Sequence, residues 1–149
     1  MNIFQANTIN SFKTRIQKLS PDTQAQWGKM NVYQMLKHCS LNDEMLLRHK
    51  PYKRLFIGRI FGKSSLKKNI KDDQPLGKNS PTHPELIIKD NGDVEAQKKA
   101  WLAILDQYPA MQENDYLDFV HPFYGKMNSE QVSRWAFKHI DHHLRQFGV

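Results

Sequence analysis

Histidine is frequent in this chain, which has seven among 149 residues. Two of them, His139 and His143, are four positions apart. On a helix this spacing places both imidazoles on one face, with Cβ atoms about 6 Å apart, so that both can reach one divalent cation. About 0.3 such pairs are expected by chance at this histidine frequency, so spacing alone is weak support. The alternative is a hydrogen-bonded pair at the edge of the core.

The position of the two histidines on their helix adds to the argument. Apolar residues at helical spacing lead up to His139 and His143, so both imidazoles extend a stripe that faces the core. Two neutral imidazoles in an apolar stripe are costly unless their nitrogens are satisfied, and a metal ion would satisfy them. A third ligand must come from another element, and His38 is the best candidate. Its alternative role is a boundary histidine that hydrogen-bonds a neighbouring helix.

A catalytic base is not evident from the sequence. His121, just before Pro122, is a further candidate that lines the site, acts as a general base or only caps a loop. No carboxylate falls on the histidine stripe. The catalytic residues therefore stay unassigned, with His121 as the one candidate.

Four segments have the periodicity of helices, and together they predict an all-α fold. They cover residues 7–19, 32–49, 94–108 and 128–147, with Asn31 and Asn128 as N-caps and Gly148 as a C-terminal stop. A long irregular crossover joins the second and third helices. Residues 53–61 suit a short helix and residues 86–88 a short strand. One long crossover is typical of a four-helix bundle.

The positive charge of the chain is concentrated in one segment. Between Arg48 and Lys71 there are nine basic residues and no acidic one, whereas the whole chain carries a formal charge of +7. Aromatic residues alternate with these charges, which is compatible with binding nucleic acid or an anionic membrane surface. A solvated charged face is the simpler interpretation, and no nucleic-acid-binding motif supports the stronger one. A third use is to hold an anionic substrate, through Lys67 and Lys68.

Length and composition limit the class of protein. With 39% hydrophobic residues and a mean hydropathy of −0.71, residues 1–149 are expected to form a single domain with one core. The single cysteine, Cys39, excludes an intramolecular disulfide. No apolar stretch approaches the roughly 20 residues of a membrane span, and no signal layout is present at the start. We therefore expect a cytoplasmic protein with no membrane span.

Several motifs resemble a known family. They lie at residues 27–38 (WGKMNVYQMLKH), 75–79 (PLGKN), 121–127 (HPFYGKM) and 138–149 (KHIDHHLRQFGV). Together they are similar to an uncharacterised bacterial family of the DinB/YfiT-like superfamily. The resemblance implies a four-helix bundle that holds a divalent metal through His38, His139 and His143, the same three residues that spacing and facing suggest. It also implies chemistry with low-molecular-weight thiols, and related bundles commonly form homodimers.

These observations lead to two expectations about function. The first is a metal-dependent enzyme, a thiol-dependent transferase or a hydrolase, that acts on a small, anionic substrate. Three neutral nitrogen ligands leave coordination positions open, as in catalytic sites, and zinc, nickel or iron would suit them. The alternative is a non-enzymatic binding module that uses segment 48–71, with the histidines structural. A nucleic-acid partner is the less favoured version of this alternative.

Overall fold

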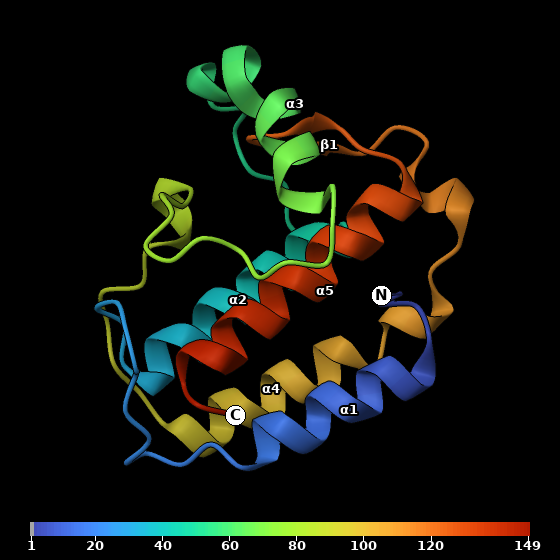
Figure 1. Ribbon diagram of the computed structural model, residues 1–149. Coiled ribbons are helices and arrows are strands. Elements are labelled where there is room, and N and C mark those ends of the chain that lie inside the picture. Colours follow the sequence, from blue (N-terminus) through green and yellow to red (C-terminus); the bar gives the residue numbers. More distant parts are fainter. Residues whose placement is uncertain (1) are drawn as a thin grey trace.

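The computed structural model describes residues 2–149 and is mainly helical, with 55% of its residues in helices. This part of the chain contains five α-helices and one small hairpin, arranged as in Figure 1. The helices are α1 (Ala6–Gln17), α2 (Val32–Leu46), α3 (Phe56–Ile70), α4 (Val94–Leu105) and α5 (Ser129–Gln146). The hairpin pairs β1 (Val120–His121) with β2 (Gly125–Lys126), and three 3-10 turns are η1 (Pro84–Leu86), η2 (Tyr108–Ala110) and η3 (Glu113–Tyr116).

The four predicted helices are present, and α2 and α5 begin directly after their asparagine caps. The side chains of Asn31 and Asn128 each accept a hydrogen bond from the backbone N–H of the third helical residue, a glutamine. The side chain of that glutamine in turn accepts one from the backbone N–H of the asparagine, which completes a capping box. Gly148 has a φ of 77°, the left-handed conformation expected just beyond a helix end. Helix α2 ends at Leu46, earlier than predicted, because Arg48 takes a φ of 67°.

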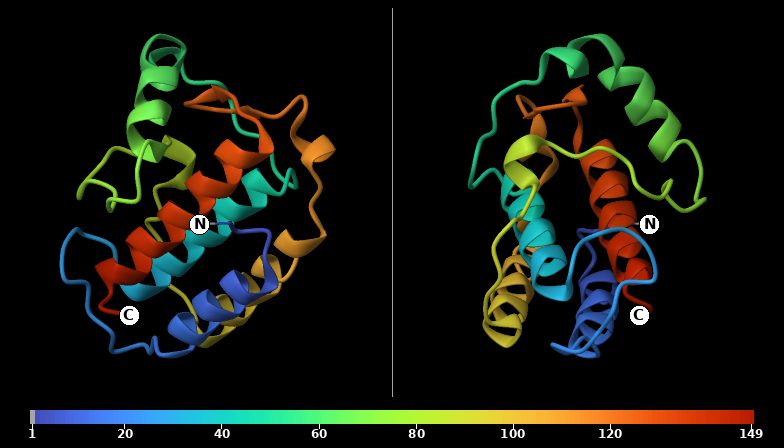
Figure 2. Two further views of the ribbon diagram at one scale, coloured as in Figure 1. Left: turned by 45° about the vertical axis from the view of Figure 1, so that its right-hand side comes forward. Right: turned by 90° about the vertical axis from the view of Figure 1, so that its left-hand side faces the viewer.

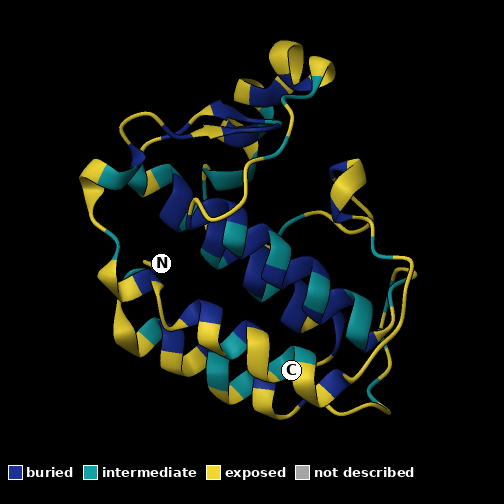
Figure 3. Cartoon of the chain, turned by 180° about the vertical axis from the view of Figure 1, so that it is seen from behind, coloured by how far each residue is buried: buried dark blue, intermediate teal, exposed yellow. Residues whose placement is uncertain are grey.

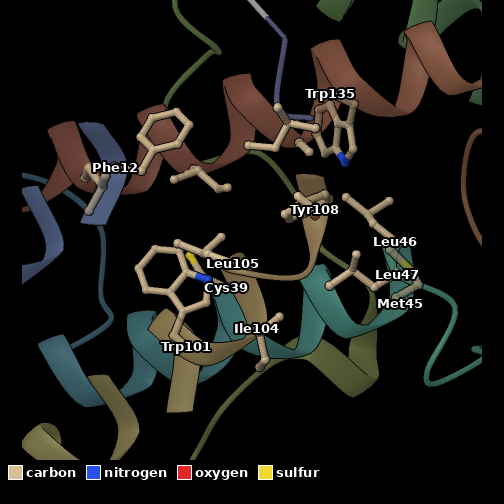
Figure 4. Packing of buried hydrophobic residues seen from close by; sticks show 14 of the residues in the cluster. Phe12, Cys39, Met45, Leu46, Leu47, Trp101, Ile104, Leu105, Tyr108 and Trp135 are labelled. Atoms are coloured by element: carbon tan, nitrogen blue, oxygen red, sulfur yellow. The ribbon is translucent and has the colours of Figure 1, made fainter. Parts of the chain in front are cut away.

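These four helices enclose the core. Helix α2 contacts α4 and α5, and α1 contacts the same two helices. Figure 2 shows α2 and α5 side by side, and α1 beside α4. Their inward faces are buried and their outward faces exposed (Figure 3). Trp101, Leu105 and Tyr108 are buried in the core that the four helices enclose (Figure 4).

The predicted irregular crossover contains a complete helix, α3, which is a correction to the sequence analysis. The predicted short helix at 53–61 instead runs over Phe56–Ile70. Its buried residues are Gly58, Gly62 and Leu66, and a Cβ at either glycine would collide with the carbonyl oxygen of Phe123. The helix therefore packs against the hairpin through its backbone, and the apolar period by which a helix is normally found is missing.

The predicted strand at 86–88 is wrong. Residues Pro84–Leu86 form the turn η1, which His83 caps by accepting a hydrogen bond from the Glu85 amide. The opposite ring nitrogen of His83 donates to the Lys53 carbonyl oxygen at 3.1 Å. Pro84 at the first position of the turn fixes a helical φ, which disfavours an extended strand. The crossover is thus attached to the chain that leads into α3.

None of the helices within residues 2–149 combines the length and the apolar character that crossing a membrane requires.

Candidate metal centre

The structure brings the three predicted histidines together between α2 and α5. His38 comes from α2, and His139 and His143 come from successive turns of α5. Their ring centroids are 5.1 Å apart for His38 and His139, 4.8 Å for His38 and His143, and 4.6 Å for the pair on α5. All three side chains are at most 7% exposed. We call this group the histidine triad.

The imidazole of His38 is oriented by the crossover. Its Nδ1 lies 2.9 Å from the carbonyl oxygen of Leu86, an acceptor only, so Nδ1 carries the proton. Nε2 is therefore unprotonated and carries a lone pair, and it lies 3.1 Å from Nε2 of His139. A carbonyl that holds the outer nitrogen of a histidine is the usual outer support of a metal ligand.

The imidazole of His143 is oriented in the same way by a side chain from its own helix. Gln146 donates through Nε2 to the carbonyl oxygen of Trp27 at 2.8 Å, which fixes the orientation of its amide. Its Oε1 then faces Nδ1 of His143 at 2.9 Å and accepts the proton there. The Nε2 of His143 is consequently unprotonated, like that of His38.

His139 differs from the other two because its outer nitrogen has no support. Its Nδ1 is buried and has no hydrogen-bond partner among the described residues. Burial lowers the pKa of all three histidines, to about 3 for His143, and the neighbouring imidazoles lower the pKa of His139 further. The triad is thus neutral at physiological pH, the state in which imidazole binds metals.

The donor set fits a divalent cation. One nitrogen from each histidine lies within 4.8 Å of the other two. Two nitrogens on one tetrahedral zinc ion are about 3.3 Å apart, close to the 3.1 Å between His38 and His139. Three imidazoles suit zinc, nickel, iron or copper, so the ligands do not select one metal.

Beyond the triad, an aromatic side chain from the loop before α2 and a basic one from the crossover after α3 lie close together. The Trp27 ring packs edge-on against His142, with centroids 5.8 Å apart. The ammonium of Lys78 lies 4.3 Å from the centroid of the Trp27 ring. Lys67 and Lys68, which the sequence suggested for anion binding, are exposed and form no ion pair in the described chain. Through Trp27 and His142, Lys78 is connected to the helix that carries His139 and His143.

His121 caps a loop, one of the three roles considered for it. Its Nδ1 accepts hydrogen bonds from the backbone amides of Phe123 and Tyr124, at 3.1 and 3.2 Å. Its ring lies 6.3 Å from that of Trp135, which in turn lies 5.6 Å from His139. Burial lowers the pKa of His121 to about 3, so it stays neutral and holds the hairpin.

Sequence reasoning missed two kinds of residue. Gln146 and Leu86 orient the triad, but neither a glutamine near a helix end nor a backbone carbonyl has a recognisable signature. Asp43 is fully buried and accepts hydrogen bonds from Trp101 and Tyr108 at 2.7 and 2.9 Å. A signal for Asp43 existed, since it lies four residues after Cys39 on the apolar face of α2.

Comparison with known proteins gives a single result. No curated protein and no solved structure matches the chain significantly. A family model described as "Protein of unknown function (DUF1569)" matches residues 4–148, nearly the whole chain. The helices, the crossover and all three histidines fall within the matched region. The chain therefore belongs to the DUF1569 family.

Proposed function

We propose that this protein is an enzyme that uses a divalent metal held by His38, His139 and His143. We further propose that its fold is a DinB/YfiT-like bundle to which α3 and the hairpin are added. The motifs of the sequence and the packing of α1, α2, α4 and α5 support this assignment. The reaction we favour is a thiol-dependent transfer or a hydrolysis.

The observation that carries the proposal is the arrangement of protons in the triad. Leu86 and Gln146 hold the protons of His38 and His143 on the outer nitrogens, so two inner lone pairs remain. Only His139 can then offer a proton to the centre, and its single N–H cannot satisfy both lone pairs well. If it does so, its Nδ1 stays buried and unpartnered. A cation among the three nitrogens satisfies all of them, whereas hydrogen bonds do not.

The number of ligands favours catalysis over a purely structural site. Structural zinc sites are closed by four protein ligands, and no fourth histidine, cysteine or carboxylate joins the triad among the described residues. A bound metal would polarise a substrate oxygen or stabilise a thiolate. The chain itself keeps the three imidazoles neutral and fixes the direction of two of them, His38 and His143.

Lys78 and Trp27 support a small anionic substrate. The ammonium of Lys78 over the indole of Trp27 supplies a positive charge beside an apolar surface. A carboxylate-bearing thiol matches this pair, because its charge meets Lys78 and its carbon atoms pack on the ring. This assignment replaces Lys67 and Lys68 with Lys78 as the anion-binding residue.

Metal content tests the proposal directly. Untagged protein purified near pH 8 is measured by elemental mass spectrometry, beside the double variant His139→Ala/His143→Ala. We expect about one transition metal per chain in the wild type and none in the variant. The matched control is His142→Ala, which removes an adjacent histidine outside the triad and should keep the metal. A metal-loaded protein is then screened for thiol transfer and hydrolysis.

Two results would contradict the proposal. Absence of bound metal, with no uptake of added zinc or nickel, would make the histidines structural and favour a non-enzymatic binding module. Equal loss of metal in the His142→Ala control would show that the metal binds elsewhere on α5.

A further inference from the structure

The outer side of α3 exposes large apolar side chains, whereas a surface helix usually buries them. Its first half exposes large apolar side chains: Phe56 is 76% exposed, Ile57 53%, Ile60 59% and Phe61 52%. Its second half exposes Lys63, Lys67 and Lys68. At about 100° per residue, these seven residues lie within one half of the helix surface, opposite Gly58 and Gly62. We call these seven residues the outer face of α3.

The helix is held firmly in this orientation. Gly58 and Gly62 pack against the backbone of Phe123. Arg54, just before the helix, donates to the carbonyl oxygens of His121, Pro122 and Phe123 at 2.8–3.0 Å. Figure 1 shows α3 standing beside β1 at the end of the molecule away from α1 and α4, and Figure 2 confirms this placement. The exposed apolar residues are therefore a fixed feature of the surface.

The charges of the outer face are available to a partner. Other basic residues of segment 48–71 are used internally, since Arg48 pairs with Asp118 and Arg54 binds carbonyl groups. Lys63, Lys67 and Lys68 form no ion pair in the described chain, and segment 48–71 contains no acidic residue. An apolar helix surface continuous with free lysines is complementary to a lipid surface with negative headgroups.

We propose that α3 is an interfacial helix that docks the protein onto an anionic membrane surface. Phe56, Ile57, Ile60 and Phe61 enter the boundary between headgroups and acyl chains, and Lys63, Lys67 and Lys68 contact the phosphates. The strand β1 beside this helix carries a further exposed apolar residue, Val120, at 55%. This inference does not depend on the metal, and either proposal can fail alone.

A lipid surface explains the outer face better than two other partners. A second copy of the chain, packed face to face, would set the lysines of one copy either against those of the other, with like-charge repulsion, or against its apolar residues, which would bury unpaired charges. Single-stranded nucleic acid is bound by aromatic stacking, but half of the apolar residues here are isoleucines, which do not stack on bases.

Sedimentation with vesicles tests the proposal. Wild-type protein as purified is mixed at low salt with vesicles of phosphatidylglycerol and phosphatidylcholine in equal parts, or of phosphatidylcholine alone. We expect binding to the anionic vesicles, weakened by salt, and little binding to the neutral ones. The variant Phe56→Ser/Phe61→Ser should bind the anionic vesicles about 100-fold more weakly. The variant Lys63→Gln/Lys67→Gln should lose about 30-fold.

Matched controls make the same chemical changes on other surfaces. Ile87→Ser/Leu117→Ser removes two exposed apolar residues, and Lys18→Gln/Lys99→Gln removes two exposed charges. Both controls should bind the vesicles like the wild type, and metal content and helical circular dichroism should be unchanged in every variant.

The proposal is overturned by absence of binding to anionic vesicles, by equal binding to both vesicle types, or by equal losses in the controls. Dimerisation that the phenylalanine variant abolishes, without vesicle binding, would assign the outer face to a second copy. Retention of single-stranded DNA that the lysine variant abolishes, again without vesicle binding, would assign it to nucleic acid.

Discussion

Helix α2 buries polar side chains on two of its faces, and the two faces differ in how fully these side chains are hydrogen-bonded. Toward α4, the Asp43 carboxylate is fully buried and receives hydrogen bonds from Trp101 and Tyr108. Toward α5, the inner nitrogens of His38 and His143 each carry a lone pair, and among the three histidines only His139 can offer them a proton. The polar network around Asp43 is complete, whereas that of the triad is not.

This difference separates a structural polar group from a candidate site. A satisfied buried network fixes the packing of the helices around it, and nothing needs to be added to it. An unsatisfied one costs free energy unless a ligand completes it, and such sites are typical of function. The comparison predicts that changes on the α4 face alter stability and that changes on the α5 face alter metal binding.

The largest effect is expected from His139→Leu. Losing one of three ligands should weaken zinc binding by at least about 1,000-fold, or about 4 kcal/mol. The metal-free variant should unfold within about 1 kcal/mol of the wild type, because removing the buried, unpartnered Nδ1 offsets the loss of the Nε2 hydrogen bond to His38. Zinc titration and urea unfolding with a chelator measure the two quantities. A large loss in the free energy of unfolding of the metal-free variant would show that the triad stabilises the fold and would contradict a metal-binding role.

Asp43→Ala should give the opposite pattern. It leaves the donors of Trp101 and Tyr108 buried without an acceptor, so we expect a loss of about 3 kcal/mol in the free energy of unfolding. Zinc affinity, measured by titration below the unfolding temperature, should stay within about twofold of the wild-type value. A large loss of zinc affinity in the folded variant would remove the distinction between the two faces.

Gln146→Leu tests the outer support of the triad. Without the Oε1 acceptor, the Nδ1 proton of His143 is no longer held, and metal affinity should fall by about 10- to 100-fold. Gln146→Glu is the matched control, since its carboxylate still accepts that proton and should retain most of the affinity. Competition with a chromophoric chelator gives both values. Equal losses in the two variants would indicate that Gln146 acts through Trp27 instead.

The effect that is smallest per step of the measurement is a pH dependence on the α4 face. Burial raises the pKa of Asp43 to about 7, above that of the unfolded chain, although its hydrogen bonds oppose this shift. The folded state therefore keeps a proton that the unfolded state loses, and this stabilisation falls as pH rises from about 4 to about 7. Relative to Asp43→Asn, the metal-free wild type should lose about 1 kcal/mol per pH unit in that window. Urea unfolding of both proteins at several pH values measures this difference, and a constant difference would contradict the raised pKa.

The sequence predicted the elements whose apolar residues face inward. Helices α2 and α5 have asparagine caps and helical apolar stripes, so their first residues and the positions of His38, His139 and His143 could be predicted. Helix α3 has the opposite arrangement. Its buried face consists of Gly58, Gly62 and Leu66, and its large apolar residues are exposed. Periodicity therefore detected only part of it.

The surroundings of the candidate site were harder to predict for a different reason. The contact of His38 with Leu86 joins residues 48 positions apart, and that of Gln146 with Trp27 joins residues 119 positions apart. Such contacts depend on how the crossover and the loop before α2 are laid over the helices. No local pattern encodes that path.

The hydrogen bond from His38 to the carbonyl oxygen of Leu86 has a consequence for mutagenesis. Because the acceptor belongs to the backbone, every residue type at position 86 supplies it, and an alanine scan or an alignment will pass over this support. Chemical synthesis can reach it: replacing the amide between residues 86 and 87 by an ester makes the carbonyl a poorer acceptor while it leaves all side chains intact. The carbonyl group that orients His38 therefore cannot be removed by a side-chain substitution, but it can be weakened by chemical synthesis of the backbone.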